Sequence, residues 1–356
     1  MKILYFTRAL PDPLYERLLN EGYALNNPSN QNFHSRLIAS LRLGAEVECV
    51  TLLPSNIASK DIVRYPGWHY LVPRGILLPL ANQFNDLGIN DFDIVLFDTL
   101  AVKLGQVAVT KAKEKGVKAV GIITDHPKNI AKAPFYFRIA VNELWKGASA
   151  SIALCPALVL PNKPLFLLPG IVREEAAVPH KEEFPYLYFA GALSSRFGAP
   201  SLVEAYLKAD LRWPLLVAGH ASDLKINDNR VVFLGQLTEK ENASYEAGAA
   251  LLLNPRPLDP ELDQESIPSK MFEYLASGRP IVSTRHPYFY PRYKDSIDFI
   301  DESVFEKYFL AHKDEKGSLK GLKPNTSGKM VVNEYGVSHW SKPLLHFLEE
   351  TMAASN

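Results

Sequence analysis

The chain has 356 residues, of which 47% are hydrophobic and 22% charged, a balance typical of a globular protein long enough for two domains. Lys plus Arg and Asp plus Glu number 39 each, so the net charge does not indicate binding to nucleic acid. The two cysteines form no C-x-x-C pair, which argues against a disulfide framework and a structural zinc site.

Short apolar runs recur along the first half of the chain, and amphipathic stretches separate them. Most runs are continuous and not alternating, which is typical of strands buried on both faces of a parallel sheet. Residues 32–44 and 101–116 have helical patterns that end on Gly44 and Gly116. The predicted strands are KILYF (2–6), VECVTLL (47–53), DIVLF (93–97), KAVGIIT (118–124), ASIALC (150–155) and PLFLL (164–168).

A charged stretch without periodicity, residues 167–185, predicts a linker between two domains. The second half then repeats the earlier pattern, and a capping box of Thr238 and Glu241 opens a predicted helix over 238–248. The predicted strands there are YLYFA (186–190), PLLVAG (214–219), VVFLG (231–235), AALLL (249–253), PIVST (280–284) and IDFI (297–300).

Alternating strands and helices in both halves predict an α/β protein with two doubly wound, Rossmann-like domains. We expect them over residues 1–170 and 171–335, with residues 336–356 as a helix that returns towards the first domain. This C-terminal helical pattern is predicted to break near Pro343. No signal-peptide pattern and no apolar run of membrane-spanning length occur, so we expect a cytoplasmic protein.

The common signatures of nucleotide, hydrolase and metal sites are absent from the sequence. No G-x-G-x-x-G follows the first strand of either half, and no P-loop, G-x-S-x-G or H-E-x-x-H motif occurs. No group of histidines and cysteines has the spacing of metal ligands. Any ligand site must therefore come from a less common pattern.

The stretch ESIPSKMFEYLASGRPIV (265–282) carries such a pattern. Pro268 suits the first turn of a helix and Ser-Gly-Arg-Pro its end, which predicts a helix over 268–277. Because a strand precedes this helix, its N-terminus lies at the carboxyl end of the sheet, where free N–H groups attract anions such as a diphosphate. Lys270 opposes the helix dipole there, which is understandable if it also holds phosphate.

Two acids accompany this lysine. Glu273 is placed to accept hydrogen bonds from a ribose diol, and Glu265 to face a sugar. The alternative is an ordinary amphipathic helix with solvated Glu and Lys, and the spacing alone favours that alternative. The spacing therefore suggests a nucleotide-sugar site without deciding for it.

This segment resembles the E-x₇-E signature of retaining nucleotide-sugar glycosyltransferases with the GT-B fold, of glycosyltransferase family four. It is most similar to the P-S-K-x-x-E-Y-L-x-S-G-x-P core of bacterial capsular and exopolysaccharide enzymes. The resemblance implies two Rossmann-like domains that face across a cleft, the first binding the acceptor and the second the donor. Other stretches that are similar to this family are 27–41, 122–127, 188–207, 230–237 and LLLNPRP (251–257).

The resemblance implies a role for each matching residue of the second half. Arg196 and Lys270 would stabilise the leaving diphosphate as catalytic groups, together with Glu265 at the transferred sugar. Family members often have Gly-Arg where this chain has Gly191 and Ala192, so Arg256 is expected to compensate for the missing arginine. The implied donor contacts are Gly191 at the phosphates, Gln236 and Leu237 at the base, Glu273 at the ribose, Ser266 and Ile267 at the sugar, and Arg256.

The acceptor side is less defined. The family often places a histidine at the end of the strand over 118–124, and here that position is Asp125 or His126. The alternatives are a helix cap for Asp125 and an ordinary loop residue for His126. Asn32 is a further acceptor-side residue, and His220 is interpreted as structural.

The implied function is transfer of a hexose, with retention, from a nucleotide diphosphate sugar, with a UDP-sugar favoured. The implied acceptor is a saccharide or a polyprenyl-diphosphate-linked saccharide, in polysaccharide or glycoconjugate biosynthesis. We expect no metal or other cofactor and no nucleic-acid partner, and we interpret residues 258–265 as a mobile acidic loop. The alternatives are a non-catalytic nucleotide-sugar-binding scaffold and a GT-B epimerase or phosphorylase.

Residues 128–147 mix the basic side chains of Lys128, Lys132 and Arg138 with several aromatic ones. This composition leaves open a peripheral contact with the inner face of a membrane. The alternative, which the sequence favours, is an ordinary helix with aromatic core residues.

Overall fold

The chain divides into two compact units. Unit 1 contains Met1–Ile171, Gln264–Ile267 and Val337–Asn356, and unit 2 contains Val172–Asp263 and Pro268–Gly336. His220 and Lys132 lie outside the described residues. The computed structural model describes residues 1–23, 25, 27–55, 57, 62–72, 80–85, 87–89, 91–130, 133–158, 162–219 and 228–354.

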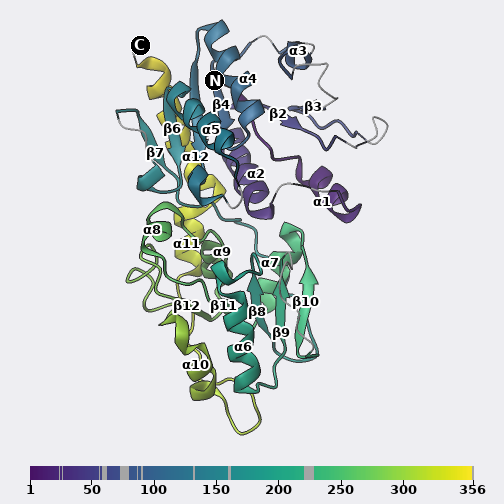
Figure 1. Ribbon diagram of the computed structural model, residues 1–356, viewed down its shortest axis with the longest axis vertical. Helices are drawn as coiled ribbons and strands as arrows, with labels where there is room; N and C mark the ends of the chain where they lie inside the picture. Colours follow the sequence, from purple (N-terminus) through teal and green to yellow (C-terminus); the bar gives the residue numbers. More distant parts are fainter. Residues whose placement is uncertain are drawn as a thin grey trace. The chain divides into compact units, whose positions relative to one another are not determined.

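Unit 1 has a seven-stranded parallel sheet in the order β3-β2-β1-β4-β5-β6-β7 (Figure 1). Strand β1 pairs with β2 on one side and with β4 on the other, so the winding of the chain reverses between β1 and β4. Strand β3, at the edge of the sheet, was not predicted. The strands are β1 (Lys2–Phe6), β2 (Glu46–Leu52), β3 (Trp68–Leu71), β4 (Ile94–Asp98), β5 (Lys118–Ile123), β6 (Ala150–Ala153) and β7 (Leu165–Leu167).

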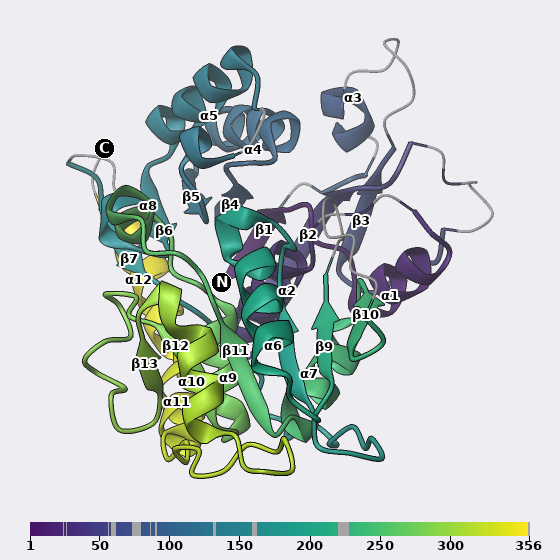
Figure 2. The same cartoon turned by 60° about the horizontal axis from the view of Figure 1, so that its bottom comes forward.

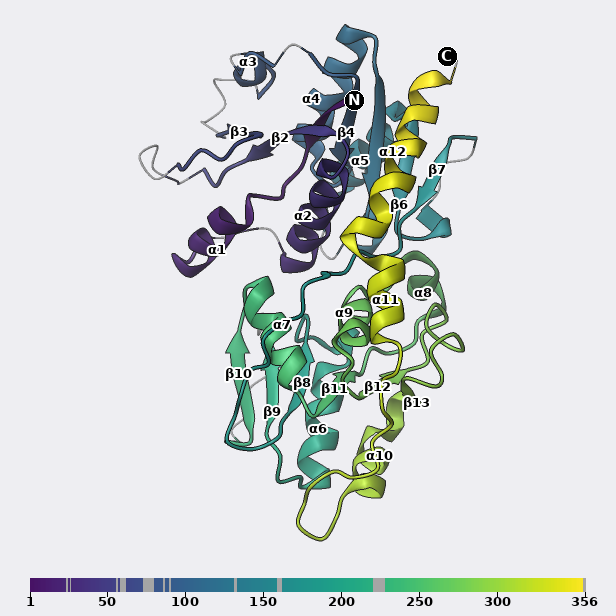
Figure 3. The same cartoon turned by 180° about the vertical axis from the view of Figure 1, so that it is seen from behind.

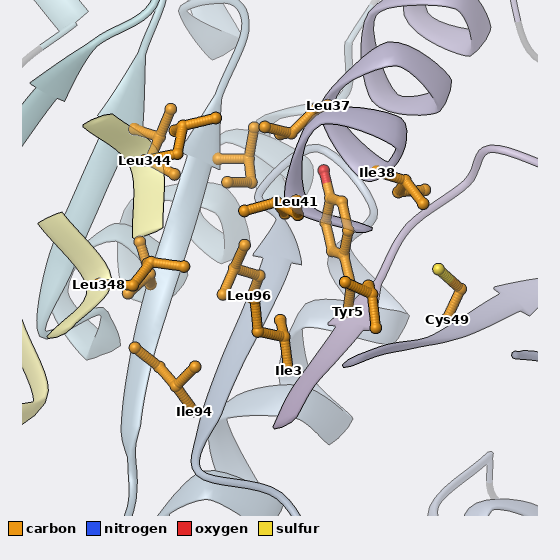
Figure 4. Close-up of a cluster of buried hydrophobic side chains, with 14 of the residues drawn as sticks. Ile3, Tyr5, Leu37, Ile38, Leu41, Cys49, Ile94, Leu96, Leu344 and Leu348 are labelled. Atoms are coloured by element: carbon orange, nitrogen blue, oxygen red, sulfur yellow. The ribbon is translucent and has the colours of Figure 1, made fainter. Parts of the chain in front are cut away.

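Neighbouring residues of a strand point to opposite faces of the sheet. The strands of this sheet are apolar on both faces, and helices cover each face. Ile3 and Tyr5 of β1 join a core with α2 and α12, part of which Figure 4 shows. Leu4 and Phe6 join a second core with α4, and α12 lies beside α2 (Figure 3). The helices of unit 1 are α1 (Asp12–Asn20), α2 (Pro28–Arg42), α3 (Leu80–Asn85), α4 (Val102–Lys115), α5 (Phe135–Gly147) and α12 (Val337–Ala353).

Unit 2 has a six-stranded parallel sheet in the order β10-β9-β8-β11-β12-β13. Its winding reverses between β8 and β11, because β8 pairs with β9 on one side and with β11 on the other. Leu187 and Phe189 of β8 join a core with α6 and α10, which pack side by side (Figure 2). The strands are β8 (Leu187–Ala190), β9 (Leu215–Ala218), β10 (Val231–Gly235), β11 (Leu251–Asn254), β12 (Ile281–Thr284) and β13 (Asp298–Ile300).

The helices of unit 2 include most of one that was not expected, whose last residues, Gln264 and Glu265, belong to unit 1. The predicted mobile acidic loop is wrong, since Pro260–Glu265 forms helix α8. Asp259 explains this helix, because its carboxylate accepts from Glu261 N–H and Leu262 N–H, both at 3.1 Å, and a proline follows at the first helical position. The other helices are α6 (Ala199–Ala209), α7 (Glu239–Gly248), α9 (Lys270–Ser277), α10 (Phe305–His312) and α11 (Gly328–Tyr335).

The predicted break near Pro343 is also wrong. Pro343 lies inside α12, and the helical stretch is interrupted at Gly336, between α11 and α12. A side chain at position 336 would lie 2.5 Å from both the Glu174 carboxylate and the Val332 carbonyl, so this site accepts only glycine without rearrangement. Gly336 is also where unit 2 ends, while α12 belongs to unit 1.

Candidate functional site

The reversal of winding in unit 2 marks the place where open α/β sheets bind ligands, outside the carboxyl ends of the two central strands. Strand β8 ends at Ala190 and β11 at Asn254. Three residues predicted from the sequence lie here: Gly191 directly after β8, Arg256 shortly after β11, and Lys270 at the start of α9.

Lys270 is tied directly to the end of β8. Its Nζ donates a hydrogen bond of 3.3 Å to the carbonyl of Ala190 and lies 4.2 Å from the ring centroid of Phe189, a cation–π distance. A side chain on Gly191 would begin 3.5 Å from this Nζ. That distance is an ordinary contact, so it is the φ of +152° that favours glycine at 191, and glycine keeps the backbone beside the ammonium free of a side chain.

The charge of Lys270 depends on what lies beside it. Burial, together with the nearby charge of Arg256, lowers the pKa of Lys270 to about 7, while Glu246 acts to raise it. The side chain keeps some exposed area, but protein atoms surround its ammonium closely. Near neutral pH the group is therefore only partly protonated, and a bound diphosphate would restore its full charge.

Glu246, the carboxylate that opposes this lowering of the Lys270 pKa, was not predicted from the sequence. It is 3% exposed and accepts a hydrogen bond of 2.7 Å from Asn242, whose carbonyl oxygen accepts 2.7 Å from the hydroxyl of Tyr188. A signal was present, because an acid in the last turn of α7 opposes the helix dipole.

Arg256 is held by a buried carboxylate. Its Nη2 lies 3.3 Å from Oδ1 of Asp263, to which Nε2 of His286 also comes within 3.5 Å, and all three residues are buried. The hydroxyl of Thr284 donates 2.6 Å to the Arg256 carbonyl. Burial raises the pKa of Asp263, while Arg256 acts to lower it. Arg256 thus lies near Lys270, and its contact with a donor stays a prediction.

Two close backbone approaches shape the loop after β8. A side chain on Gly219 would start 1.9 Å from the carbonyl of Gly191, and one on Gly198 would start 2.1 Å from the carbonyl of Pro255. Their φ angles of +144° and +74° also favour glycine. Gly219 was not singled out from the sequence. Between these contacts Arg196 is exposed on a short 3₁₀ turn, Ser195–Phe197.

Other predicted donor residues lie along the same sheet edge. Glu273 is partly exposed in the first turn of α9, which begins at Lys270, slightly later than expected, and ends on Gly278 with φ of 71°. Gln236, exposed, and Leu237, partly exposed, follow β10, which lies two strands from β8 in the sheet order. Their roles toward the ribose and the base stay predictions.

Glu265, Ser266 and Ile267 belong to unit 1, whereas Lys270 belongs to unit 2. The carboxylate of Glu265 lies 2.8 Å from Nζ of Lys128 and accepts 2.9 Å from the side-chain amide of Asn129. Although burial opposes ionisation, these two contacts hold the pKa of Glu265 below its usual value. The predicted contact of Glu265 with a sugar stays a prediction.

His126, and not Asp125, provides the helix cap. Its Nδ1 accepts 3.1 Å from the N–H of Lys128 at the start of a 3₁₀ turn, Pro127–Asn129, and its ring packs edge-on against Trp145. Burial lowers the pKa of His126. Asn32 is partly exposed on α2, and no role in acceptor binding follows from its position.

A polar cluster that was not predicted from the sequence lies at the corresponding place in unit 1. Arg8 follows β1 and Asp98 ends β4, so the pair lies where the winding of that sheet reverses, with His34 against Asp98. The available signal was a charged residue directly at the carboxyl end of a buried strand. Among the described residues, no three His, Cys, Asp or Glu side chains are grouped so as to hold a metal ion.

Comparison with solved structures identifies the fold. Sucrose-phosphate synthase from Thermosynechococcus elongatus superimposes with a TM-score of 0.72 at 14% identity, covering 100% of both chains. HepE of Anabaena in complex with UDP-glucose gives 0.63 at 13% identity, covering 98% of this chain and 100% of that one. A putative UDP-N-acetylglucosamine 2-epimerase from Listeria monocytogenes gives 0.54 at 11%, covering 98% and 96%.

The predicted α/β fold with two Rossmann-like domains of the GT-B type is therefore confirmed. No protein-family model and no curated protein sequence matches the chain. At these identities the structural likeness defines the fold, and the chemistry has to be argued from the site.

Proposed function

We propose that this protein is a retaining glycosyltransferase that moves a hexose from a nucleotide diphosphate sugar to a saccharide or lipid-linked saccharide in polysaccharide or glycoconjugate biosynthesis. The observation that carries the proposal is Lys270, tied to the Ala190 carbonyl beside Gly191 where the sheet of unit 2 reverses. The structural likeness to sucrose-phosphate synthase and to HepE, which was solved with UDP-glucose, supports it and favours a UDP-sugar.

Lys270 and Arg196 are proposed to stabilise the negative charge that grows on the diphosphate as the glycosidic bond breaks. Glu273 binds the ribose, and Glu265 contacts the transferred sugar. Arrival of the dianionic diphosphate favours the protonated form of Lys270, so the ligand itself completes the cation. The sugar is transferred on the face that the diphosphate leaves, which gives retention, and protein cations do the work that a divalent metal does elsewhere.

The test is release of nucleoside diphosphate from a panel of nucleotide sugars, with and without EDTA and with mixed saccharide acceptors. We expect release from one donor, unchanged by EDTA and lost in Lys270→Met. Lys111→Met is the matched control, because Lys111 also lies over an aromatic ring, 6.0 Å from the centroid of Phe84, but in unit 1. Turnover that requires added Mg²⁺ or Mn²⁺ would disprove metal independence, and nucleotide binding without turnover would favour a non-catalytic scaffold.

A second candidate is sugar epimerisation, favoured by the full-length likeness to the Listeria protein named as a putative 2-epimerase. This reaction changes a sugar without an acceptor. Incubation with UDP-N-acetylglucosamine alone, followed by proton NMR of the sugar, separates the two functions. Appearance of the 2-epimer would support the second candidate, whereas an intact donor that turns over only with an acceptor would support the first.

We also propose a peripheral contact of α5 with a membrane that carries the acceptor. Phe135, Tyr136 and Ile139 are 78%, 75% and 47% exposed at the start of this helix, and Arg138 is exposed among them. Among the described residues, no helix combines the length and apolar character needed to cross a membrane. Sedimentation with anionic vesicles tests the contact. The fraction of protein that sediments with the vesicles should fall in the double variant Phe135→Ser/Tyr136→Ser.

A further inference from the structure

The sheet of unit 1 has its own ligand-binding place, where the winding reverses between β1 and β4. Arg8 follows the end of β1, and Asp98 is the last residue of β4. The Nε of Arg8 donates a hydrogen bond of 2.8 Å to Oδ2 of Asp98, so the pair connects the ends of the two central strands. Nothing in the proposed donor chemistry uses either residue.

Asp98 is completely buried, at 0% exposure, and is nevertheless ionised. Although burial opposes ionisation, Arg8 holds the pKa of Asp98 below its usual value, and the N–H of Leu100 donates 2.9 Å to its other oxygen. Burying a carboxylate costs several kcal/mol, and replacing such a pair by apolar residues is often neutral or stabilising. Stability alone therefore does not explain why the chain has this pair at a ligand-binding edge.

His34 does not share the role of cation. Its Nε2 lies 3.5 Å from Oδ2 of Asp98, and its Nδ1 is hydrogen-bonded to the hydroxyl of Tyr5, which burial keeps protonated by raising the pKa of Tyr5. His34 is itself fully buried, and burial lowers its pKa to about 4. At neutral pH the histidine is uncharged, and Arg8 is the cation that Asp98 holds.

The backbone on both sides of Arg8 is fixed as well. Ala9 N–H donates 3.0 Å to the Thr7 hydroxyl, and Leu10 exchanges two hydrogen bonds with the buried amide of Gln31, at 2.9 and 2.7 Å. These contacts and the bond to Asp98 fix the guanidinium in one orientation. Such an arrangement lowers the entropy cost of binding a ligand.

The bond to Asp98 uses only one of the nitrogens of this arginine. The side chain of Arg8 is 32% exposed, and within the described part of the chain its two terminal nitrogens have no hydrogen-bond partner. A guanidinium presents its nitrogens as a planar fork that matches the two oxygens of a carboxylate or phosphate. The buried carboxylate thus holds Nε and does not use the two terminal nitrogens.

We propose that Arg8 binds an oxyanion of the acceptor, a phosphate or a carboxylate, at the carboxyl edge of β1 and β4. The name "acceptor" for this ligand rests on the proposed transferase function, but the binding of an oxyanion by unit 1 does not. The alternative is that Arg8 only neutralises Asp98, in which case anions in solution would not reach its terminal nitrogens.

The experiment uses the full chain labelled with ¹⁵N-arginine and saturated with UDP, so that anions do not enter the donor site. Inorganic phosphate and acetate are titrated separately, and the Nε–Hε resonance of Arg8, assigned by its loss in Arg8→Lys, is followed. We expect a saturable shift with at least one of the two anions, and the stronger one identifies phosphate or carboxylate. The Arg17 resonance is the control, because Arg17 is 35% exposed and its Nε also faces a carboxylate, Glu21, at 3.8 Å.

Calorimetry with the stronger anion then compares variants. Arg8→Lys keeps a positive charge for Asp98 but loses the fork, and should weaken anion binding about tenfold or more, as expected for a lost charged hydrogen bond. Arg8→Gln/Asp98→Asn removes both charges together and should abolish anion binding while the fold is kept, as judged by thermal melting. Arg17→Lys should bind as the wild type does.

The proposal is overturned if neither anion shifts the Arg8 resonance, or if both Arg8 variants bind the anion as tightly as the wild type. UDP affinity, measured in the same variants, reports the donor site separately. A wild-type protein that does not bind UDP would contradict the proposed transferase function. The Arg8 proposal would still be decided by whether anions shift the Arg8 resonance.

Discussion

Binding of a nucleoside diphosphate to unit 2 should draw a proton onto Lys270. Burial lowers the pKa of this lysine to about 7 in the unliganded protein, against about 10.4 for an ordinary lysine. A diphosphate beside the ammonium favours the charged form and returns the pKa towards its ordinary value. The ligand therefore binds the protonated form of Lys270, and the affinity falls as the pH rises through 7.

The magnitude follows from this shift. With a pKa of about 7 when free and two or more units higher when bound, the protein takes up about 0.5 proton at pH 7 and about 0.8–0.9 at pH 8. Above pH 8 the affinity should fall about tenfold per pH unit until the pKa of the complex is reached. The terminal phosphate of UDP titrates near pH 6, so its own ionisation contributes little above pH 7.

Calorimetry of UDP binding in buffers with different ionisation enthalpies measures this proton uptake directly at pH 7, 8 and 9. Lys270→Met should abolish the uptake and flatten the pH dependence, whereas the control Lys111→Met should retain both. Wild-type binding at pH 8 without proton uptake would refute the reasoning, because it would mean that Lys270 is either charged before the ligand arrives or distant from the phosphates.

Three further outcomes are expected. Glu273→Ala should weaken UDP binding by about 1–3 kcal/mol, the cost of lost charged hydrogen bonds, with an unchanged melting temperature, and calorimetry checks this. Arg196→Ala should lower kcat about 10²–10³-fold and at least as much as Lys270→Ala, with a less than additive double variant, in steady-state kinetics. Near wild-type kcat in Arg196→Ala would make Arg256 the second cation. Because the unfolded chain binds the His34 proton more tightly, with pKa values of 6.5 unfolded and about 4 folded, unit 1 should lose about 2 kcal/mol of unfolding free energy between pH 7 and 4.5. Urea unfolding at both pH values should show this loss, and a pH dependence in His34→Gln equal to that of the wild type would contradict it.

The strands could be predicted from sequence wherever both faces are buried. The run KILYF predicts β1 at its observed bounds, because Ile3 and Tyr5 enter one core while Leu4 and Phe6 enter the other. Strand β3 (WHYL) was missed because it lies at the edge of its sheet, where His69 and Tyr70 are partly exposed and the continuous apolar pattern is lost.

The predictions of helix boundaries were wrong where a local sequence signal was given the wrong weight. Pro343 was expected to break a helix, yet it is accommodated within α12, while the interruption falls at Gly336, where close contacts from Glu174 and Val332 leave no room for a side chain. Asp259 followed by proline was a capping signal for α8, and the acidic composition of that stretch concealed it.

The position of Lys270 at the carboxyl end of the sheet could be predicted, because its helix follows a strand, and the cation that opposes the helix dipole was visible in the sequence. Its role toward a ligand was favoured only by the family resemblance and stays a prediction. The residues that contact Lys270 could not be predicted. Glu246, which raises the pKa of Lys270, and Ala190, which accepts its hydrogen bond, come from separate elements that meet only when the sheet forms. The same holds for Arg8 and Asp98, which are 90 residues apart in the chain.

The two units follow one rule and differ in how they hold a cation. In each, the sheet reverses its winding between two central strands, and a basic side chain is tied to the end of one of them. In unit 2 that group is a lysine bonded to a neutral carbonyl. Burial lowers its pKa, so it becomes fully protonated only when an anionic ligand binds. In unit 1 it is an arginine paired with a buried carboxylate, and an arginine is not deprotonated in proteins. Diphosphate binding by unit 2 should therefore weaken above neutral pH, while oxyanion binding by Arg8 persists. If only the nucleotide affinity depends on pH above 7, the Lys270 site gains its charge when the ligand binds, whereas the Arg8 site is charged before any ligand arrives.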